Sequence, residues 1–335
     1  MQAWQLERMS LDGLTRRELP TPRIAAHQVL VRVRAVSINP HDVHVARGAF
    51  GPMPLPLIPL ADGAGEVVEV GPSVTRIAVG ARVIGTFVQG WISGRLSSEL
   101  RATALGGPRA GVLAEYAVFD EAAVVVVPDA LSFEEAATLP IAGATAWSAL
   151  FGEASVRPGH TVVVQGTGGV SMFAIQLAAA AGARVISLSS DDAKLAVARS
   201  HGASATINYR AVPDWDRQVR ALTDGVGADL VVDVAGALQA SINATRTGGQ
   251  VSVIGLLAGT RTEIDIVSLL AGNVRLQGIQ TGSRAVLAEV VHAFAQRGLR
   301  PVIHRRYTFD DAPRAYAAIA EHQSYIGKLV IEGAP

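Results

Sequence analysis

The chain has 335 residues, of which 49% are hydrophobic and 17% are charged. This composition excludes a disordered chain, and the length predicts two domains at the usual size of about 150 residues each. Its 29 Lys and Arg residues balance 29 Asp and Glu residues, so no charge excess favours nucleic acid or an anionic membrane as a partner. The chain contains no cysteine, which excludes disulfides, thiolate zinc sites, iron–sulfur clusters and cysteine nucleophiles.

The first residues carry Glu7, Arg8 and Asp12, which interrupt the apolar stretch that a secretory signal needs. The sequence also lacks an uninterrupted apolar run of about 18 residues, the length of a membrane-spanning helix. We therefore expect a soluble, cytoplasmic protein.

The first 125 residues are predicted to be rich in β-strands. Residues 29–36 alternate between apolar and polar side chains, the period of a half-buried strand, and 65–70 and 82–87 predict further short strands. Prolines between residues 52 and 59 predict extended, non-helical backbone. Residues 89–111 have no clean period and hold several turn-forming glycines, so we expect a long surface loop there.

From about residue 124 the pattern changes to that of an α/β domain. Apolar strands separated by helical patterns predict a parallel sheet covered on both faces, and six strands complete a doubly wound sheet. A helix with one apolar face is predicted after the first of these strands, and Gly182 ends it. The tail from residue 281 predicts one long helix, 284–296, and a final apolar strand, 328–331. The six predicted strands are 161–164, 184–188, 203–207, 230–234, 250–254 and 274–279.

A glycine-rich turn follows the first strand of this sheet and opens the next helix. It reads Gly166-Thr167-Gly168-Gly169-Val170, with Ser171 in place of the third glycine of the G-x-G-x-x-G pattern. Gly166 and Gly168 permit a sharp turn and a close backbone approach to a pyrophosphate at the helix N-terminus. Such turns are common between strands and helices, but a six-strand α/β pattern around this one favours dinucleotide binding over a purely structural turn.

The end of the second strand bears on the choice of cofactor. NAD-binding folds usually place Asp or Glu there, whereas this chain has Ser189 and Ser190, whose hydroxyls can donate to a 2′-phosphate. Lys194 and Tyr209 could close such a phosphate pocket, so NADP(H) is favoured. Alternatively, Ser190 or Asp191 caps the next helix and Lys194 is solvated, or Asp191 is itself the ribose ligand and NAD(H) is the cofactor.

At this point the chain resembles the medium-chain dehydrogenase/reductase superfamily over essentially its whole length. The motifs that carry the resemblance, specific in their order and spacing together, are 36–42 (VSINPHD), 62–67 (DGAGEV), 139–146 and 164–170. The resemblance implies a GroES-like β-barrel catalytic domain, residues 1–125 completed by 281–335. It also implies a Rossmann dinucleotide-binding domain, residues 126–280. We further expect a homodimer.

The resemblance also bears on metal binding. Zinc enzymes of the superfamily ligate catalytic zinc at positions that correspond here to Asn39, Ala61-Asp62 and Ile141. Asn39, Ala61 and Ile141 are not competent zinc ligands. The chain is therefore similar to the zinc-free, quinone-oxidoreductase-like branch, whose Asn-Pro-x-Asp motif matches 39–42. His41 and His44 stand three residues apart, but no third ligand accompanies them, so metal binding is the minority interpretation.

Several site residues are implied by position in the superfamily. Asn39 is expected to orient the acceptor carbonyl, with a turn cap ahead of Pro40 as its structural alternative. His44 matches a proton-relay position, or is simply an exposed histidine near a cleft. The positions that match the nicotinamide end of the cofactor site are Thr145, beside the ring, and the backbone of Ile254, Ile279 and Thr281.

Three functions follow as hypotheses. The first is NADPH-dependent reduction of quinones or α,β-unsaturated carbonyls. The second is a zinc-free alcohol or ketone oxidoreductase, which would need a proton relay such as His44. The third is a non-catalytic protein, since some relatives of this branch are lens crystallins or bind RNA. The balanced charge opposes RNA binding, and the intact glycine turn opposes a dead cofactor site.

Overall fold

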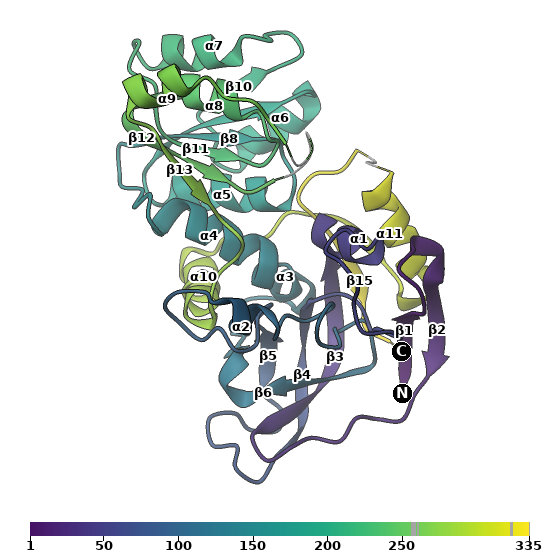
Figure 1. Cartoon of the computed structure of the whole chain (residues 1–335). Coiled ribbons are helices and arrows are strands. Elements are labelled where there is room, and N and C mark those ends of the chain that lie inside the picture. Colours follow the sequence, from purple (N-terminus) through teal and green to yellow (C-terminus); the bar gives the residue numbers. More distant parts are fainter. Residues whose placement is uncertain (256–258, 260, 322–323, 335) are drawn as a thin grey trace. The chain divides into compact units, whose positions relative to one another are not determined.

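The structure, a computed structural model, describes residues 1–255, 259, 261–321 and 324–334. The chain divides into two compact units: unit 1, Met1–Ala144 with Gly282–Pro335, and unit 2, Thr145–Thr281 (Figure 1). Both ends of the chain therefore belong to unit 1. The division differs from the predicted boundary after residue 125, because the helix Phe133–Ala137 packs on the strands of unit 1.

Unit 1 contains a seven-stranded sheet and a two-stranded ribbon. Its strands are β1 (Gln2–Leu6), β2 (Leu14–Glu18), β3 (Gln28–Ile38), β4 (Asp62–Val70), β5 (Arg82–Gly85), β6 (Tyr116–Asp120), β7 (Val124–Val126), β14 (Ile303–Tyr307) and β15 (Lys328–Glu332). The sheet order is β14-β15-β3-β4-β5-β7, with β6 on β3, and β1 pairs with β2. Only β14 and β15 run parallel within these described strands. The sequence-predicted strands at 29–36, 65–70 and 82–87 are thereby confirmed.

The helices of unit 1 are short except for one. They are α1 (Pro40–Ala46), α2 (Ser98–Arg101), α3 (Phe133–Ala137), α10 (Arg284–Arg297) and α11 (Ala312–Ala320), with 3₁₀ turns at Leu11–Gly13, Glu121–Ala123 and Phe309–Asp311 and a π-helix at Leu139–Gly143. Ser132 and Glu135 form a reciprocal capping box that begins α3. Ser283 caps α10, and Gly298 ends it in the left-handed region, at φ +61°.

The prediction of a long surface loop at 89–111 is wrong in part. The segment contains α2 and folds back on the strand region before it: Leu105 N donates to Phe87 O, and Gln89 N donates to Thr103 O. Gln89 and Leu105 are both buried. The glycines suggested a loop, but apolar side chains spaced without a regular period can still pack into a core.

Unit 2 contains a six-stranded parallel sheet with the order β10-β9-β8-β11-β12-β13. The strands are β8 (Thr161–Gln165), β9 (Arg184–Ser189), β10 (Ala205–Asn208), β11 (Ala228–Asp233), β12 (Thr245–Val253) and β13 (Arg275–Gly278). The helices are α4 (Ala144–Phe151), whose first residue still belongs to unit 1, α5 (Gly169–Ala180), α6 (Asp192–Ser200), α7 (Trp215–Leu222), α8 (Leu238–Ala244) and α9 (Ile266–Gly272). All six predicted strands are confirmed. The order is that of a Rossmann sheet, whose direction of winding reverses between β8 and β11.

Helices of unit 2 pack against the strands of the parallel sheet. Helices α5 and α6 contact β8, β9 and β10, whereas α8 and α9 contact β11 and β12 (Figure 1). The prediction of a single apolar face for α5 is too narrow, because residues 171–178 are all buried. Within the part of the chain that the structure describes, no helix has the length and apolar character needed to span a bilayer.

Candidate functional site

A buried carboxylate organises a polar cluster in unit 1. Asp62, the first residue of β4, is fully buried. Its Oδ1 accepts a hydrogen bond of 3.0 Å from the backbone N–H of Ile141, and its Oδ2 accepts one of 2.8 Å from Nδ2 of Asn39. Asn39, Asp62 and Ile141, which lie at or beside the positions matched to zinc ligands, therefore meet around one carboxylate.

A lysine from the end of the chain completes this cluster. Lys328, the first residue of β15, is 3% exposed. Its ammonium donates to the backbone carbonyl of Ile38 at 3.1 Å and to Oδ1 of Asn39, and it lies 3.6 Å from Oδ2 of Asp62. Sequence reasoning missed Lys328, which it included only as the start of an apolar strand. The sequence did offer one indication of a buried cation: Lys328 is a charged residue at the start of the apolar run 329–331.

Burial dominates the electrostatics of this ion pair. Desolvation raises the pKa of Asp62 to about 6, although the Lys328 ammonium and the Asn39 hydrogen bond oppose the rise. Desolvation likewise lowers the pKa of Lys328, against the attraction of Asp62 and Asp42. Breaking a buried pair by removing one partner is strongly destabilising, because it leaves the other charge uncompensated.

Helix α1 begins beside the cluster. The backbone N–H of Asn39 donates to Oδ2 of Asp42 at 2.7 Å, and Pro40 occupies the first turn, so Asn39 does occupy the cap position ahead of Pro40. The other oxygen of Asp42, Oδ1, is buried and has no hydrogen-bond partner among the described residues; it lies 3.9 Å from Nδ1 of His41. Asn39 therefore occupies the cap position of α1 and at the same time directs its side-chain amide to Asp62 and Lys328.

The two predicted histidines lie on α1, where both rings contact Phe50. The centroid of His41 is 5.1 Å from that of Phe50 in a stacked arrangement, and His44 meets the same ring edge-on at 6.1 Å. His41 also contacts Phe87 edge-on at 5.0 Å. The three-residue spacing thus brings both histidines to one aromatic side chain.

The glycine turn of unit 2 provides an open cradle at the start of α5. Gly166 has φ +70°, in the left-handed region that glycine adopts without strain. A Cβ built on Gly168 would meet no atom within 4 Å, so the space above this residue is free. Ser171, in place of the third glycine, donates from its hydroxyl to Gln165 O at 2.8 Å. Open backbone at a helix N-terminus fits a pyrophosphate.

The structure places the predicted phosphate-pocket residues at the ends of two neighbouring strands. Tyr209 N donates to Ser189 O at 3.0 Å, which brings the carboxyl ends of β9 and β10 together. The Ser189 side chain is buried, and its hydroxyl oxygen is 3.4 Å from the backbone N of Asp191. Ser190 and Lys194 are half-buried, and Tyr209 is exposed.

Asp191 is the cap of α6, as the alternative interpretation proposed. Its Oδ1 accepts from the backbone N–H groups of Ala193 at 2.8 Å and Lys194 at 3.3 Å. This carboxylate thus satisfies donors at the first turn of the helix. Its use as a cap gives Asp191 a structural role independent of any ribose.

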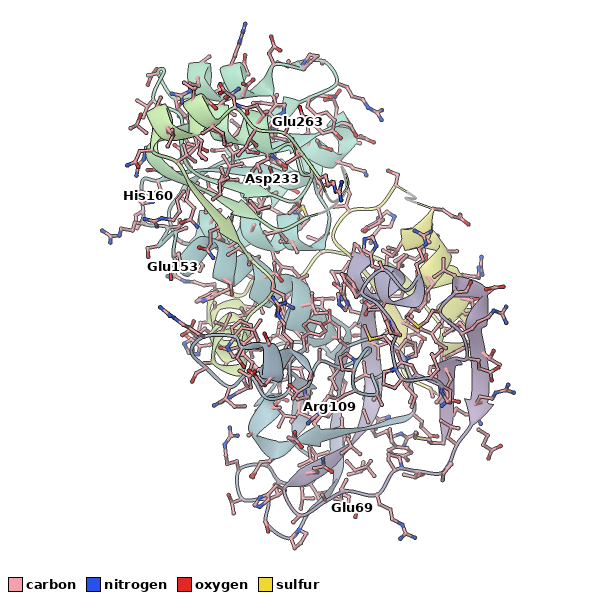
Figure 2. The ribbon with its side chains drawn as sticks, in the orientation of Figure 1. Glu69, Arg109, Glu153, His160, Asp233 and Glu263 are labelled. Atoms are coloured by element: carbon pink, nitrogen blue, oxygen red, sulfur yellow. The ribbon has the colours of Figure 1, made fainter. Side chains whose placement is uncertain are left out.

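A buried network lies where the sheet reverses its winding direction. Asp233, the last residue of β11 and labelled in Figure 2, accepts from Ser241 Oγ at 2.7 Å and from Gly236 N at 2.6 Å. Ser241 in turn accepts from Nε2 of Gln165, the last residue of β8, also at 2.7 Å. The network joins the carboxyl ends of β8 and β11 and holds the turn after β11. Ligands of doubly wound sheets bind at this reversal.

The last predicted positions are those matched to the nicotinamide end of the cofactor site. Thr145 Oγ1 donates to Gln280 O at 3.4 Å, and both Thr145 and Thr281 are buried. Ile254 N donates to Asp233 O and Ile279 N donates to Val253 O, each at 2.9 Å. The N–H groups of Ile254 and Ile279 are therefore used within the protein.

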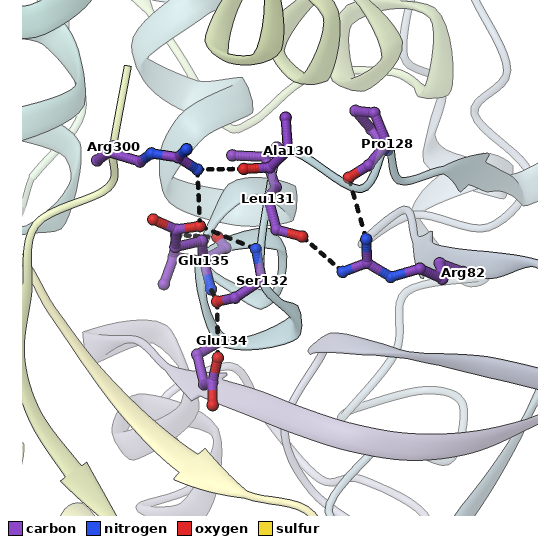
Figure 3. Close-up of polar contacts among 9 residues, drawn as sticks. Arg82, Pro128, Ala130, Leu131, Ser132, Glu134, Glu135 and Arg300 are labelled. Atoms are coloured by element: carbon purple, nitrogen blue, oxygen red, sulfur yellow. Dashed lines mark hydrogen bonds and ion pairs between the residues drawn. The ribbon is translucent and has the colours of Figure 1, made fainter. Parts of the chain in front are cut away.

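Unit 1 also contains a cavity of about 600 Å³ whose lining includes Arg82, Glu135 and Arg300 and none of the residues of the Asp62 cluster; Figure 3 shows the polar contacts of these side chains. Arg82 donates to Pro128 O and Leu131 O, and Arg300 donates to Ala130 O and to Glu135. These arginines hold the turn that precedes α3. Because both guanidinium groups donate to backbone oxygens of this turn, we assign them a structural role.

Comparisons with known proteins agree with this architecture. Residues 25–129 match the alcohol dehydrogenase GroES-like domain, and residues 169–296 match the zinc-binding dehydrogenase family. A zinc-type alcohol dehydrogenase-like protein of Schizosaccharomyces pombe is 38% identical, over 96% of this chain and 95% of its own. A quinone oxidoreductase-like protein 2 homolog of Nematostella vectensis is 30% identical, over 93% of this chain and 83% of its own.

A solved structure shows the same likeness over the full length. The crystal structure of an NAD-dependent alcohol dehydrogenase has a TM-score of 0.91 and 34% identity, and the match covers 100% of both chains. The two units, their sheets and these relatives give one result: the chain belongs to the medium-chain dehydrogenase/reductase superfamily and is an NAD(P)-dependent oxidoreductase of that superfamily.

Proposed function

We propose that the protein is a zinc-independent, NADPH-dependent reductase of quinones or α,β-unsaturated carbonyls. The observation that carries the proposal is the Asp62 cluster. At the matched zinc-ligand positions, an amide and a backbone N–H donate to this carboxylate, and the ammonium of Lys328 lies beside it. These donors and the ammonium already occupy the carboxylate, which opposes its use as a metal ligand and leaves the Asn39 amide to meet the acceptor.

The cradle of unit 2 supports a nicotinamide dinucleotide, which when bound supplies the hydride. Residues 166–170 would hold its pyrophosphate on the backbone at the start of α5. Thr145, Thr281 and the carbonyl oxygens of Ile254 and Ile279 would hold the nicotinamide end, since the N–H groups of both isoleucines are used elsewhere. A fluorescence titration with NADPH tests this assignment. Saturable binding is expected, whereas absence of binding would favour the non-catalytic alternative.

The preference for NADPH is proposed on the end of β9. Ser189, Ser190, Lys194 and Tyr209 provide hydroxyl groups and one cation for a 2′-phosphate. The nearest carboxylate in sequence, Asp191, uses one of its oxygens, Oδ1, to cap α6. NAD(H) remains the alternative cofactor, and one similar solved structure is named an NAD-dependent enzyme.

Asn39 is proposed to bind the acceptor. Hydride addition to a carbonyl compound leaves negative charge on its oxygen, which hydrogen-bond donors must then stabilise. A ketone concentrates that charge on one alkoxide, whereas an enone or quinone spreads it over an enolate or hydroquinone anion. The neutral amide of Asn39 suits the second case better, and His44 is at most an accessory proton source.

The test of this role is Asn39→Ala at saturating NADPH. Removal of one donor to a developing oxyanion typically lowers turnover about a hundredfold. A loss of that size on the best acceptor is expected. Unchanged turnover would remove Asn39 from the reaction.

We also propose a homodimer formed through unit 2. β13 is an edge strand, and edge strands present unpaired backbone groups. Helix α9, just before β13, exposes Ile266, Val267 and Leu270, the last two at 72%. Light scattering should give the mass of a dimer, and Leu270→Glu should shift it toward the monomer. A monomeric wild-type protein would contradict the proposal.

A further inference from the structure

The side-chain amide of Asn39 is held at both ends by charged groups. Its Oδ1 accepts from the Lys328 ammonium, and its Nδ2 donates to Oδ2 of Asp62 at 2.8 Å. An ammonium has no acceptor and an ionised carboxylate has no donor, so the two partners permit only one orientation of the amide. The flip that usually leaves an Asn amide ambiguous is excluded here.

The hydrogen count of the cluster leaves one donor unused. The Lys328 ammonium carries three hydrogens and has three oxygens near it: Ile38 O and Asn39 Oδ1, to which it donates, and Asp62 Oδ2 at 3.6 Å. Nδ2 of Asn39 carries two hydrogens, and one of them is used on Asp62. The second has no acceptor among the residues that the structure describes. Asn39 is 5% exposed, so the cluster leaves this one amide hydrogen available in an otherwise buried setting.

We propose that Lys328 and Asp62 are positioning residues that fix the Asn39 amide with one N–H directed to the acceptor oxygen. This inference rests on the proposed role of Asn39. The ammonium at Oδ1 also draws electron density from the amide, which makes the remaining N–H a stronger donor, as hydrogen bonds in a chain polarise one another. Lys328 thus acts on the reaction through Asn39 and without contact to the acceptor.

A purely structural role is the competing explanation. Lys328 opens β15, which pairs with β3 through Leu329 and Ile38, so the ion pair could serve only to attach this strand. A structural role predicts that loss of Lys328 lowers stability and affects turnover equally whether Asn39 is present or absent. A positioning role predicts that its effect on turnover disappears once Asn39 is gone. A double-mutant cycle separates the two.

The experiment compares wild type, Lys328→Met, Asn39→Ala and the double variant at saturating NADPH with the best acceptor. We expect Lys328→Met to lower kcat about tenfold or more in the wild-type background and less than twofold in the Asn39→Ala background. NADPH affinity, measured by fluorescence titration, should be unchanged in all four. Tyr316→Phe is the matched control, since it removes another fully buried polar group of unit 1 and should leave kcat unchanged.

A second variant serves as the control for misfolding. If Lys328→Met alone fails to fold, Lys328→Met with Asp62→Asn removes both charges of the ion pair, so that Asp62 is not left as an uncompensated buried carboxylate. This neutral pair should also lower kcat, because either end of the amide can then face the acceptor. Equal losses with and without Asn39, or full activity of the neutral pair, would overturn the inference alone. Unchanged kcat in Asn39→Ala would instead overturn the proposed role of Asn39, and the inference with it.

Discussion

The backbone N–H of Ile141 donates to Oδ1 of Asp62 at 3.0 Å, across 79 positions of sequence. Both residues are fixed locally: Ile141 lies in a π-helical turn, and Asp62 begins a central strand. A position that supplies a metal ligand in zinc relatives therefore contributes a backbone hydrogen bond here. The Asp62 carboxylate consequently has three protein partners: this N–H, Asn39 and the nearby Lys328.

The first prediction concerns metal content. Because the ammonium of Lys328 lies 3.6 Å from Asp62, a dication at this carboxylate would meet strong like-charge repulsion. Elemental analysis of the purified protein should find no stoichiometric zinc, and a chelator should leave activity unchanged. Stoichiometric zinc, with activity lost on chelation and restored by metal, would refute this.

The second prediction concerns the cofactor. Lys194→Ala should raise the KM for NADPH about tenfold or more and leave that for NADH nearly unchanged, because a charge-assisted hydrogen bond to phosphate contributes about 1.5–3 kcal/mol. Steady-state kinetics with both cofactors measure this. Arg199→Ala, an exposed cation on the same helix, is the matched control and should change neither constant. Equal use of both cofactors by the wild type would show that the serines do not set the preference.

The third prediction concerns the network at the winding reversal of the sheet. Ser241→Ala removes one donor from buried Asp233 and the acceptor of Gln165. Unfolding should become easier by about 1–3 kcal/mol, the usual cost of leaving a buried polar group unsatisfied. Chemical denaturation measures the change, and Ser200→Ala at an exposed site is the control. The cofactor should also bind more weakly, since the turn after β11 loses support; equal stability of the two variants would count against the network.

The fourth prediction concerns pH. The pKa of Asp62 rises from an ordinary 3.8 to about 6 in the folded state, mainly because of burial. Between these values the folded chain binds more protons than the unfolded chain, so the contribution of Asp62 to stability falls as pH rises from about 4 to about 6. The unfolding free energy of wild type relative to Asp62→Asn should decline across this interval and then level off. A difference that is constant or increases with pH would contradict the assignment.

Much of the fold could be predicted because it is encoded locally. Runs of apolar residues marked each strand of the parallel sheet, and Gly166 marked the turn at its first helix. The segment 89–111 could not be predicted, since its burial depends on distant partners of Leu105 and Gln89.

The site was predicted in part for the same reason. Asn39 was singled out from its motif, whereas the role of Lys328 depends on the pairing of β15 with β3, 289 positions away from Asn39 in sequence. The partnership of Ile141 with Asp62 uses a backbone group and leaves no mark in the residue type. The chemical character of a side chain can be read from the sequence. Contacts that depend on strand register or on backbone groups become visible only in the folded structure.

The most direct test of the proposed function is turnover by the purified protein, without added metal, with saturating NADPH across matched enone, quinone and ketone acceptors. Because an amide donor stabilises a delocalised anion better than a localised alkoxide, the best kcat/KM should belong to an enone or a quinone. That ranking should persist in the presence of chelator. A plain ketone as the best acceptor, or activity that requires added zinc, would contradict the account.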